Sequence, residues 1–375
     1  MDSVFISEIS EKIEFELHTG FDATQKPYIL HLNNSVLIPQ AFCGPREEIK
    51  VPLAQKPWRH LPGRVLWTAD NRIIRDSFYR SSLVPPRLEP LANGQWRGTL
   101  PDPKFRIDDD CVFVDLLTKH FGHMLLETPA RHWPDLFDEY REAYRDLKPV
   151  ATRTHGLSLE TSAWPKYLTD FLKSLEISFH DIHFIDQPTS FRSLFLPSRI
   201  SPYSNFGMNR SYFDLLNRSA TWLRKTSGLE LEKSQLPNKV YLSRSELATG
   251  NRSLANEIVV EDIFRKRGFD IIHPQKLDLR TQTQIIDTAT HIAGISGSQL
   301  HLGMYRGTPG LKLLRITPAH HAPPWDEMAA RFTGTEITTV SFSGPSRTIA
   351  NASSNWELNA ENVACLTERV DAWLR

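Results

Sequence analysis

The sequence predicts a mixed α/β protein built from two domains. The chain has 375 residues, more than one compact core usually holds. Beyond residue 238, short apolar runs alternate with amphipathic helical segments, and this alternation predicts βαβ units around a parallel sheet. The N-terminal part instead carries strand-like runs separated by prolines. We therefore expect an N-terminal lobe over residues 1–226, β-rich over 1–110, and a C-terminal lobe over 239–350.

Composition and charge exclude several classes of protein. The 44 Lys and Arg residues balance 44 Asp and Glu residues, so no global field draws the chain to nucleic acid, and we expect no such partner. Three widely spaced cysteines, Cys43, Cys111 and Cys365, predict neither a disulfide framework nor a zinc site. The N-terminus lacks a signal-peptide pattern, and no run approaches the roughly 20 apolar residues of a membrane span. We expect a cytoplasmic protein with no membrane segment of its own.

The N-terminal lobe begins with strand signals. Tyr28–Leu32 and Ser35–Pro39 predict two strands, and Asn33-Asn34 between them predicts a hairpin turn. Frequent prolines over Pro85–Pro103 predict a connector. Asp110–Asp115 then predicts a short buried strand.

A helical pattern follows from Gly122 to Arg145. Apolar residues recur there at three- and four-residue spacing, which gives one apolar face. Pro129 interrupts the pattern and predicts a kink or two abutting helices. Further apolar patterns predict helices over Lys166–Leu175 and Tyr212–Thr226, and strands over Ile182–Ile185 and Ser193–Pro197.

A polar stretch over residues 227–238 predicts the linker between the lobes. Strands and helices alternate after it. The expected strands are 239–243, 269–272, 291–296 and 310–316, and the expected helices are 256–268, 279–289 and 299–305. Gly268 is placed to stop the first of these helices. A last amphipathic helix is expected over Ala360–Leu374.

The first candidate binding motif is a small-residue turn between a strand and a helix. In an open parallel sheet, ligands bind outside the carboxyl ends of the strands. A helix N-terminus there offers backbone N–H groups and a partial positive charge to an anion, and Gly297 lets a diphosphate approach the backbone closely. A tight turn without a ligand is the alternative. The motif consists of Ser296, Gly297, Ser298 and Gln299.

Two arginines form the second candidate. Arg244 follows Ser243 at the end of a predicted strand, on the same side of the expected sheet as Gly297, and Arg252 comes shortly after. Guanidinium groups bind phosphate through paired, charge-assisted hydrogen bonds. Solvated surface arginines are the alternative interpretation.

The third candidate combines His123 with Glu127 and Arg131. These residues are spaced by four, so on a helix they share one face. A His–Glu pair can form a general base that works near neutral pH. The alternative is a surface ion pair between Glu127 and Arg131, with His123 packed near the helix start. The same residues could be metal ligands, but the sequence shows no third ligand.

Taken together, these segments resemble glycosyltransferase family 61, which includes bacterial capsule-associated transferases, plant xylan-decorating enzymes and animal transferases acting on glycoproteins. The similarity covers roughly residues 110 to 318 and rests on the order and spacing of several short blocks. The matching blocks are Gly122-His123, Glu127, Pro129-Ala130-Arg131-His132-Trp133, Tyr241-Leu242-Ser243-Arg244, Arg252, Asn256-Glu257, Gly268-Phe269, Gln282 or Gln284, and Gly297.

The resemblance implies a GT-B-like architecture, in which two Rossmann-like lobes flank a cleft. The C-terminal lobe would bind a nucleotide-sugar donor, the N-terminal lobe a glycan or polysaccharide acceptor such as a capsule precursor, and residues 351–375 would pack near the junction of the lobes. It further implies transfer with inversion, without a metal or a separate cofactor, in the cytoplasm or at the inner face of the membrane.

The resemblance also implies roles for the candidate residues. Glu127 is expected to be the general base, with His123 as its partner or as the alternative base, and Arg131 to orient Glu127 or contact the acceptor. The donor site is expected to consist of Ser243, Arg244 and Arg252 around the diphosphate, with Ser296, Gly297, Ser298 and Gln299 as a backbone cradle.

Two positions depart from the family pattern. Ser296 stands where the family usually has His, and Arg315 stands where its final strand usually has Glu. A carboxylate accepts hydrogen bonds and an arginine does not, so either the donor differs and carries an extra negative charge, or the site has lost activity. A non-catalytic glycan- or nucleotide-sugar-binding protein is therefore one rival function. Another nucleotide-using α/β enzyme ranks lower, since the chain lacks a Gly-x-Ser-x-Gly elbow and a phosphate loop.

Overall fold

The computed structural model forms two compact units, each described here by itself. One consists of Met1–Leu168 and Glu176–Leu215, the other of Thr169–Leu175 and Leu216–Arg375. The described residues are 102–138, 146–153, 157–177, 180–200, 210–226, 236–247, 253–319, 327, 330, 332–342 and 355–375, with the short strand segments 2–3, 12–14, 28–39, 64–67, 73–74, 89–90 and 96–97.

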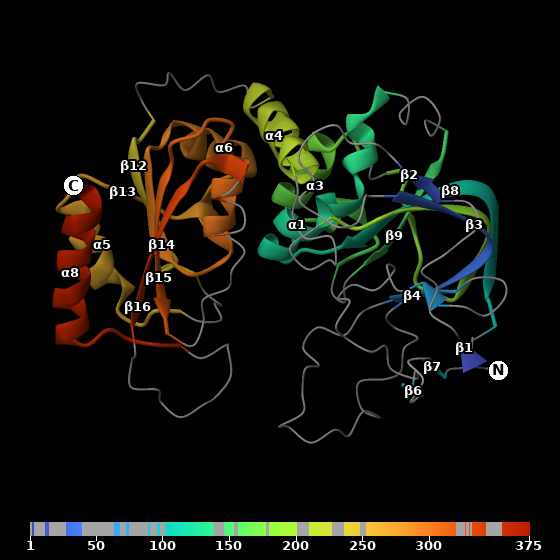
Figure 1. The fold of residues 1–375 in the computed structure, drawn as a ribbon, viewed down its shortest axis with the longest axis horizontal. Helices are drawn as coiled ribbons and strands as arrows, with labels where there is room; N and C mark the ends of the chain where they lie inside the picture. Colours follow the sequence, from blue (N-terminus) through green and yellow to red (C-terminus); the bar gives the residue numbers. More distant parts are fainter. Residues whose placement is uncertain are drawn as a thin grey trace. The chain divides into compact units, whose positions relative to one another are not determined.

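The first unit is built on a mixed sheet with the strand order β10-β9-β8-β11-β3-β4-β5, and β2 pairs with β3 beside this path (Figure 1). The four strands β8 to β11 run parallel to one another. Strand β3 pairs antiparallel with β11, β2 and β4, and β4 pairs antiparallel with β5. The bounds are β2 Lys12–Glu14, β3 Tyr28–Pro39, β4 Arg64–Trp67, β5 Ile73–Ile74, β8 Phe105–Leu117, β9 Lys148–Arg153, β10 His183–Phe184 and β11 Thr189–Pro197. A small separate sheet joins β1 (Asp2–Ser3), β7 (Trp96–Arg97) and β6 (Glu89–Pro90).

The predicted hairpin at Asn33-Asn34 is wrong, because β3 is one continuous strand. Its two halves pair with the same partner strand, β11, in a single register: Ser193 lies opposite Asn33 and Phe191 opposite Ser35. Pairing along a shared neighbour therefore outweighs the local turn preference. Asn34 nevertheless has a left-handed backbone, with φ of 51°, a conformation in which asparagine is enriched.

The helical pattern beginning at Gly122 is divided as Pro129 predicts. Helix α1 spans Phe121–Glu127, and the 3-10 helices η5 (Thr128–Arg131) and η6 (Trp133–Leu136) follow it. Pro129 lies in the first turn of η5, where its missing N–H has no helical partner to lose. The rest of the predicted segment, residues 139–145, lies outside the described residues. The predicted helices α3 (Lys166–Ser174) and α4 (Arg210–Lys225) are confirmed.

The second unit contains the predicted parallel sheet. Its order is β13-β12-β14-β15-β16, and every neighbouring pair is parallel. The order reverses between β12 and β14, and the carboxyl ends of the strands at such a switch point are where doubly wound sheets bind ligands. The bounds are β12 Lys239–Leu242, β13 Asp270–Ile272, β14 His291–Ile295, β15 Lys312–Pro318 and β16 Glu336–Phe342.

Helices cover both faces of this sheet. Figure 1 shows α5 (Glu257–Arg265) and α8 (Ala360–Leu374) on one face and α6 (Leu279–Thr288) on the other. Phe264 of α5 and Leu366, Val370 and Trp373 of α8 join the strand residues in one buried core. The 3-10 helix η10 (Ser298–Tyr305) follows β14 and packs against α6. Residues 227–235 of the predicted linker lie outside the described residues, and a place for α8 near a lobe junction stays a prediction.

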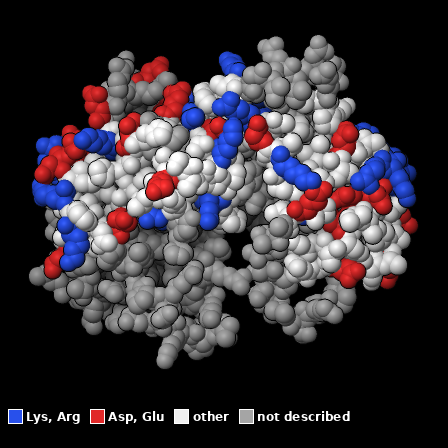
Figure 2. Space-filling model, turned by 180° about the vertical axis from the view of Figure 1, so that it is seen from behind, with Lys and Arg blue, Asp and Glu red and all other residues white. Residues whose placement is uncertain are grey.

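The described residues also bear on two expectations from the sequence, membrane spans and surface charge. None of the described helices is long and apolar enough to cross a membrane. Figure 2 shows acidic and basic side chains interspersed over the described part of one face, in agreement with the equal numbers of each in the sequence.

Candidate functional site

Strand β12 ends at the switch point of the second sheet, and the turn Ser243–Leu247 follows it. The N–H of Ser243 donates to the carbonyl of Ile272 at 2.8 Å, which prolongs the ladder with β13 by one residue. The next residue, Arg244, is partly exposed, and its Nη1 lies 3.4 Å from the carbonyl oxygen of Ser296. We call residues 243–247 the β12 turn.

Arg244 and Gly297, predicted separately, lie together. A Cβ built on Gly297 would lie 2.7 Å from Nη1 of Arg244 and 2.5 Å from Oε1 of Gln299. The meeting follows from topology, since β12 and β14 are neighbouring parallel strands and their carboxyl ends share one edge. A guanidinium therefore lies directly over the small-residue turn.

The other residues of this turn are held by the sheet. Ser296 is buried, and its N–H donates to the carbonyl of Ile316 at 2.7 Å. Gln299 uses its Nε2 to donate to the carbonyl of Ile295 at 2.6 Å, and Ser298 opens η10. Arg252, the second predicted phosphate ligand, lies outside the described residues.

Two carboxylates of α5 support the β12 turn, and neither was predicted as a site residue. Oε1 of Glu257 accepts from the N–H of Arg244 and from the Tyr241 hydroxyl, both at 3.0 Å. Glu261 accepts from the hydroxyls of Ser243 and Ser245 at 2.7 and 2.6 Å. Burial raises the pKa of the Glu257 carboxyl to about 7, against the opposing hydrogen bonds from Arg244 and Tyr241. The signal that could have located it was the Asn256-Glu257 block.

Arg315, one of the departures from the family pattern, has partners within the protein. Its side chain is 1% exposed and pairs with Glu327, including a 3.2 Å contact from Nη1, while Nη2 donates to Oγ1 of Thr339 at 3.0 Å. Its positive charge is thus compensated by a carboxylate of the same unit, and it does not by itself require a more negative ligand.

The first unit holds the other predicted site. His123 and Glu127 lie one turn apart on α1, and Nδ1 of His123 is hydrogen-bonded to Oε1 of Glu127. Their exposure differs: the His123 side chain is 15% exposed and that of Glu127 is 1%. Of the two side chains, His123 is the more exposed.

Glu127 belongs to a buried ionic network. Nη2 of Arg199 donates to its Oε2 at 2.8 Å, and Nε of Arg199 lies 3.2 Å from Oδ2 of Asp115. Arg131 donates from Nε to the same Asp115 oxygen at 2.8 Å and from Nη1 to the carbonyl of Pro197. The alternative of a surface ion pair between Glu127 and Arg131 is wrong, because both side chains are buried. The α-helix also ends at Glu127, so the four-residue face does not continue into η5.

Asp115 and Arg199 are residues that sequence reasoning missed. Asp115 lies near the end of β8, and Arg199 lies just beyond β11, the parallel neighbour of β8. The carboxyl ends of these two strands share one edge of the sheet, as those of β12 and β14 do. Asp115 is also a non-glycine residue with φ of 81°, where the ladder with β9 shifts register. Such strained positions cluster at functional sites.

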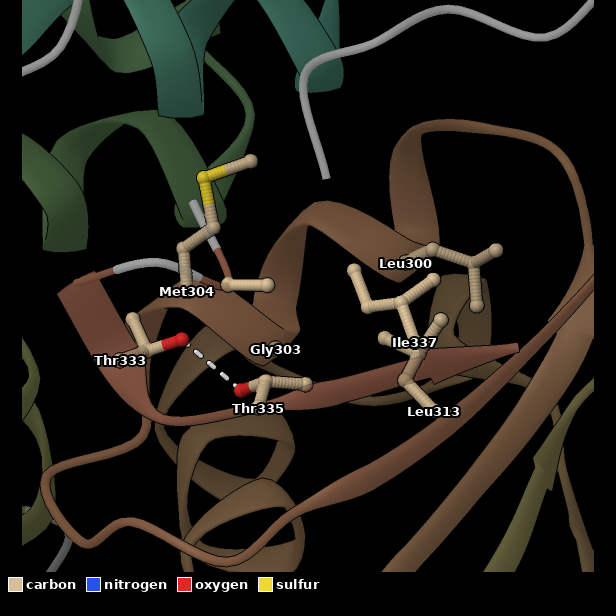
Figure 3. A pocket seen from close by; sticks show the side chains of 8 residues that line it. Leu300, Gly303, Met304, Leu313, Thr333, Thr335 and Ile337 are labelled. Atoms are coloured by element: carbon tan, nitrogen blue, oxygen red, sulfur yellow. Dashed lines mark hydrogen bonds between the residues drawn. The ribbon is translucent and has the colours of Figure 1, made fainter. Parts of the chain in front are cut away.

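The cavity between η10 and the strands β15 and β16 is lined mainly by apolar side chains (Figure 3). Leu300, Met304, Leu313 and Ile337 line it, and its polar groups include Thr333 and Thr335, whose hydroxyls lie 2.8 Å apart. Among the described residues, no group of three or more His, Cys, Asp or Glu is arranged to hold a metal ion.

These features define an α/β protein with a guanidinium over the small-residue turn of one parallel sheet and a histidine–carboxylate pair in the other unit. The family model Glycosyltransferase 61 matches residues 121–312, more than half of the chain. The chain therefore belongs to glycosyltransferase family 61. No curated protein matches it in a sequence search. Family membership indicates a transferase with donor and acceptor substrates; the GT-B arrangement and its cleft stay predictions.

Proposed function

We propose that this protein transfers a sugar, with inversion and without a metal, from a diphosphate-containing nucleotide-sugar to a hydroxyl of a glycan or polysaccharide. The observation that carries the proposal is the position of Arg244 over Gly297, at the switch point of the second sheet. A guanidinium and a helix start at one sheet edge form a set of donors suited to a diphosphate.

Donor binding follows from these groups. Arg244 gives paired hydrogen bonds to phosphate oxygens, and the absence of a side chain at Gly297 leaves the room that its guanidinium occupies beside the turn. As the bond between sugar and phosphate breaks, negative charge grows on the leaving nucleotide, and the fixed guanidinium stabilises it.

The acceptor is activated by His123 in this proposal. Glu127 was the expected base, but it is buried and bound by Arg199, so we assign it to hold the His123 ring. His123 removes the proton of the acceptor hydroxyl while the oxygen attacks the anomeric carbon. The carbon–oxygen bond to the diphosphate breaks on the opposite face, and the nucleotide leaves with the bonding electrons.

Donor binding is the direct test. A thermal-shift panel of UDP-glucose, UDP-N-acetylglucosamine, UDP-xylose, GDP-mannose and CMP-sialic acid, which lacks a diphosphate, should single out a diphosphate donor by its rise in Tm. A donor at 100 times its Kd stabilises the folded state by about 2.7 kcal/mol. Arg244→Ala should weaken binding at least about tenfold, the loss of one charge-assisted contact.

Arg369→Ala is the matched control, because Arg369 is exposed on α8 of the same unit. Equal donor affinity in the Arg244 variant and in the wild type would refute the site. A donor that binds tightly and is neither transferred nor hydrolysed with any acceptor would instead identify a non-catalytic binding protein.

A further inference from the structure

The two oxygens of the Glu257 carboxyl group have different surroundings. Its side chain is 2% exposed and lies at the start of α5, under the β12 turn. Oε1 accepts two hydrogen bonds, from the Arg244 N–H and the Tyr241 hydroxyl. Oε2 is buried and has no hydrogen-bond partner among the described residues. Buried polar atoms without partners are rare in folded proteins and ask for an explanation.

Burial has the largest effect on the pKa of this carboxyl. Two hydrogen bonds, the positive charge of Arg244 and the helix start favour the charged form. Desolvation opposes them and raises the pKa to about 7. The charged and titratable groups that face it are Tyr241 on β12, Arg244 in the turn and Glu261 on α5.

A proton on Oε2 would leave the bonds to Oε1 in place. The β12 turn therefore keeps its position in either charge state, and only the negative charge beneath Arg244 disappears. A diphosphate bound to Arg244 brings further negative charge to the same turn, which favours the neutral carboxyl. Building on the proposed donor site, we infer that Glu257 is the positioning residue of the β12 turn and that it takes up a proton when the nucleotide-sugar diphosphate binds.

Donor affinity should therefore depend on pH. The neutral carboxyl favours the anionic donor, so affinity is highest below pH 7 and falls as the pH rises through and above that value. If the bound donor raises the pKa of Glu257 by about one, donor affinity falls about tenfold between pH 6 and pH 9. At pH 7 the same change corresponds to an uptake of about 0.4 protons per donor bound.

Calorimetry tests the inference. The nucleotide-sugar selected by the panel is titrated into the wild type at pH 7 in two buffers with different ionisation enthalpies, and the difference in observed enthalpy gives the protons taken up. Glu257→Gln cannot titrate, so its binding should show no uptake and a flat affinity profile between pH 6 and pH 9. Equal uptake in this variant and the wild type, or no uptake in the wild type, would overturn the inference.

A second variant keeps the test decisive if the glutamine variant does not fold. Tyr241→Phe retains the carboxyl and the Arg244 bond but removes one hydrogen bond to the charged form, so the midpoint of the pH profile should move to higher pH. An unmoved midpoint would count against Glu257. If no nucleotide-sugar of the panel binds the wild type, the donor site itself is wrong, which is a different result.

Discussion

At the scale of single residues, the two candidate sites share one design: a partly exposed cationic or titratable side chain stands on a buried carboxylate. Arg244 is joined through its backbone to Glu257, and His123 through its ring to Glu127. The buried partners fix the position of the exposed ones. Removal of a buried partner should therefore cost stability as well as activity.

The network around Glu127 gives a stability prediction. Arg199→Met removes the guanidinium that bridges Glu127 and Asp115, leaving buried negative charge without its main compensation. We expect the free energy of unfolding in urea to fall by about 3–5 kcal/mol. The control is Arg192→Met on β11, whose ion pair with Asp110 is half-exposed and should contribute about 1 kcal/mol or less. Similar losses in both variants would mean that the network is not buried as described.

At the scale of elements, two glycines end or begin helices for different reasons. Gly268 ends α5 with φ of 75°, and Phe269 donates back to the carbonyl of Phe264 at 3.2 Å, as in a Schellman motif. Gly297 has an extended backbone with φ of 175°, so its role is spatial: its missing side chain leaves room for Arg244 and Gln299.

Alanine at these two glycines should separate stability from binding. Gly268→Ala has open space for its Cβ but a strained backbone, so it should cost about 1–2 kcal/mol of unfolding free energy and leave donor affinity unchanged. Gly297→Ala displaces the side-chain ends of Arg244 and Gln299, so it should cost about 1 kcal/mol of unfolding free energy or less, the worth of the Gln299 hydrogen bond, and weaken donor binding about tenfold or more. Chemical denaturation and calorimetry on both variants measure this; the reverse pattern would contradict the assignments.

At the scale of the whole molecule, the donor and acceptor candidates belong to different compact units. In a direct displacement both groups would act in the chemical step, but only Arg244 would also bind the donor, so donor affinity separates their roles. His123→Ala should lower kcat by about 10²- to 10⁴-fold, the usual contribution of a general base, with little change in donor Kd. Arg244→Ala should also lower kcat, because it removes charge stabilisation of the leaving nucleotide, and in addition it should raise the donor Kd and KM. His183→Ala, an exposed histidine on β10, is the control for His123.

An unchanged kcat in the His123 variant would assign the base elsewhere. A loss of donor affinity in that variant, equal to the loss in Arg244→Ala, would mean that His123 supports the donor rather than the acceptor.

The sequence by itself determined the features that depend on local physics. The alternation of strands and helices after residue 238 specified the parallel sheet, Pro129 specified the break after α1, and the small-residue turn at Gly297 specified one edge of the candidate donor site. Each rests on periodicity or backbone preference within a few residues, which can be read from neighbours in the chain.

Only the tertiary structure decided which distant groups meet. Strand β3 continues through Asn33-Asn34, because both of its halves pair with β11. The tertiary structure joined Glu127 to Arg199, 72 residues away, and gave the exposed position to His123. It also placed Glu257 under the β12 turn. Spacing along the chain does not encode burial or long-range pairing, and these decide the charge state and the partner of every group that we propose to act.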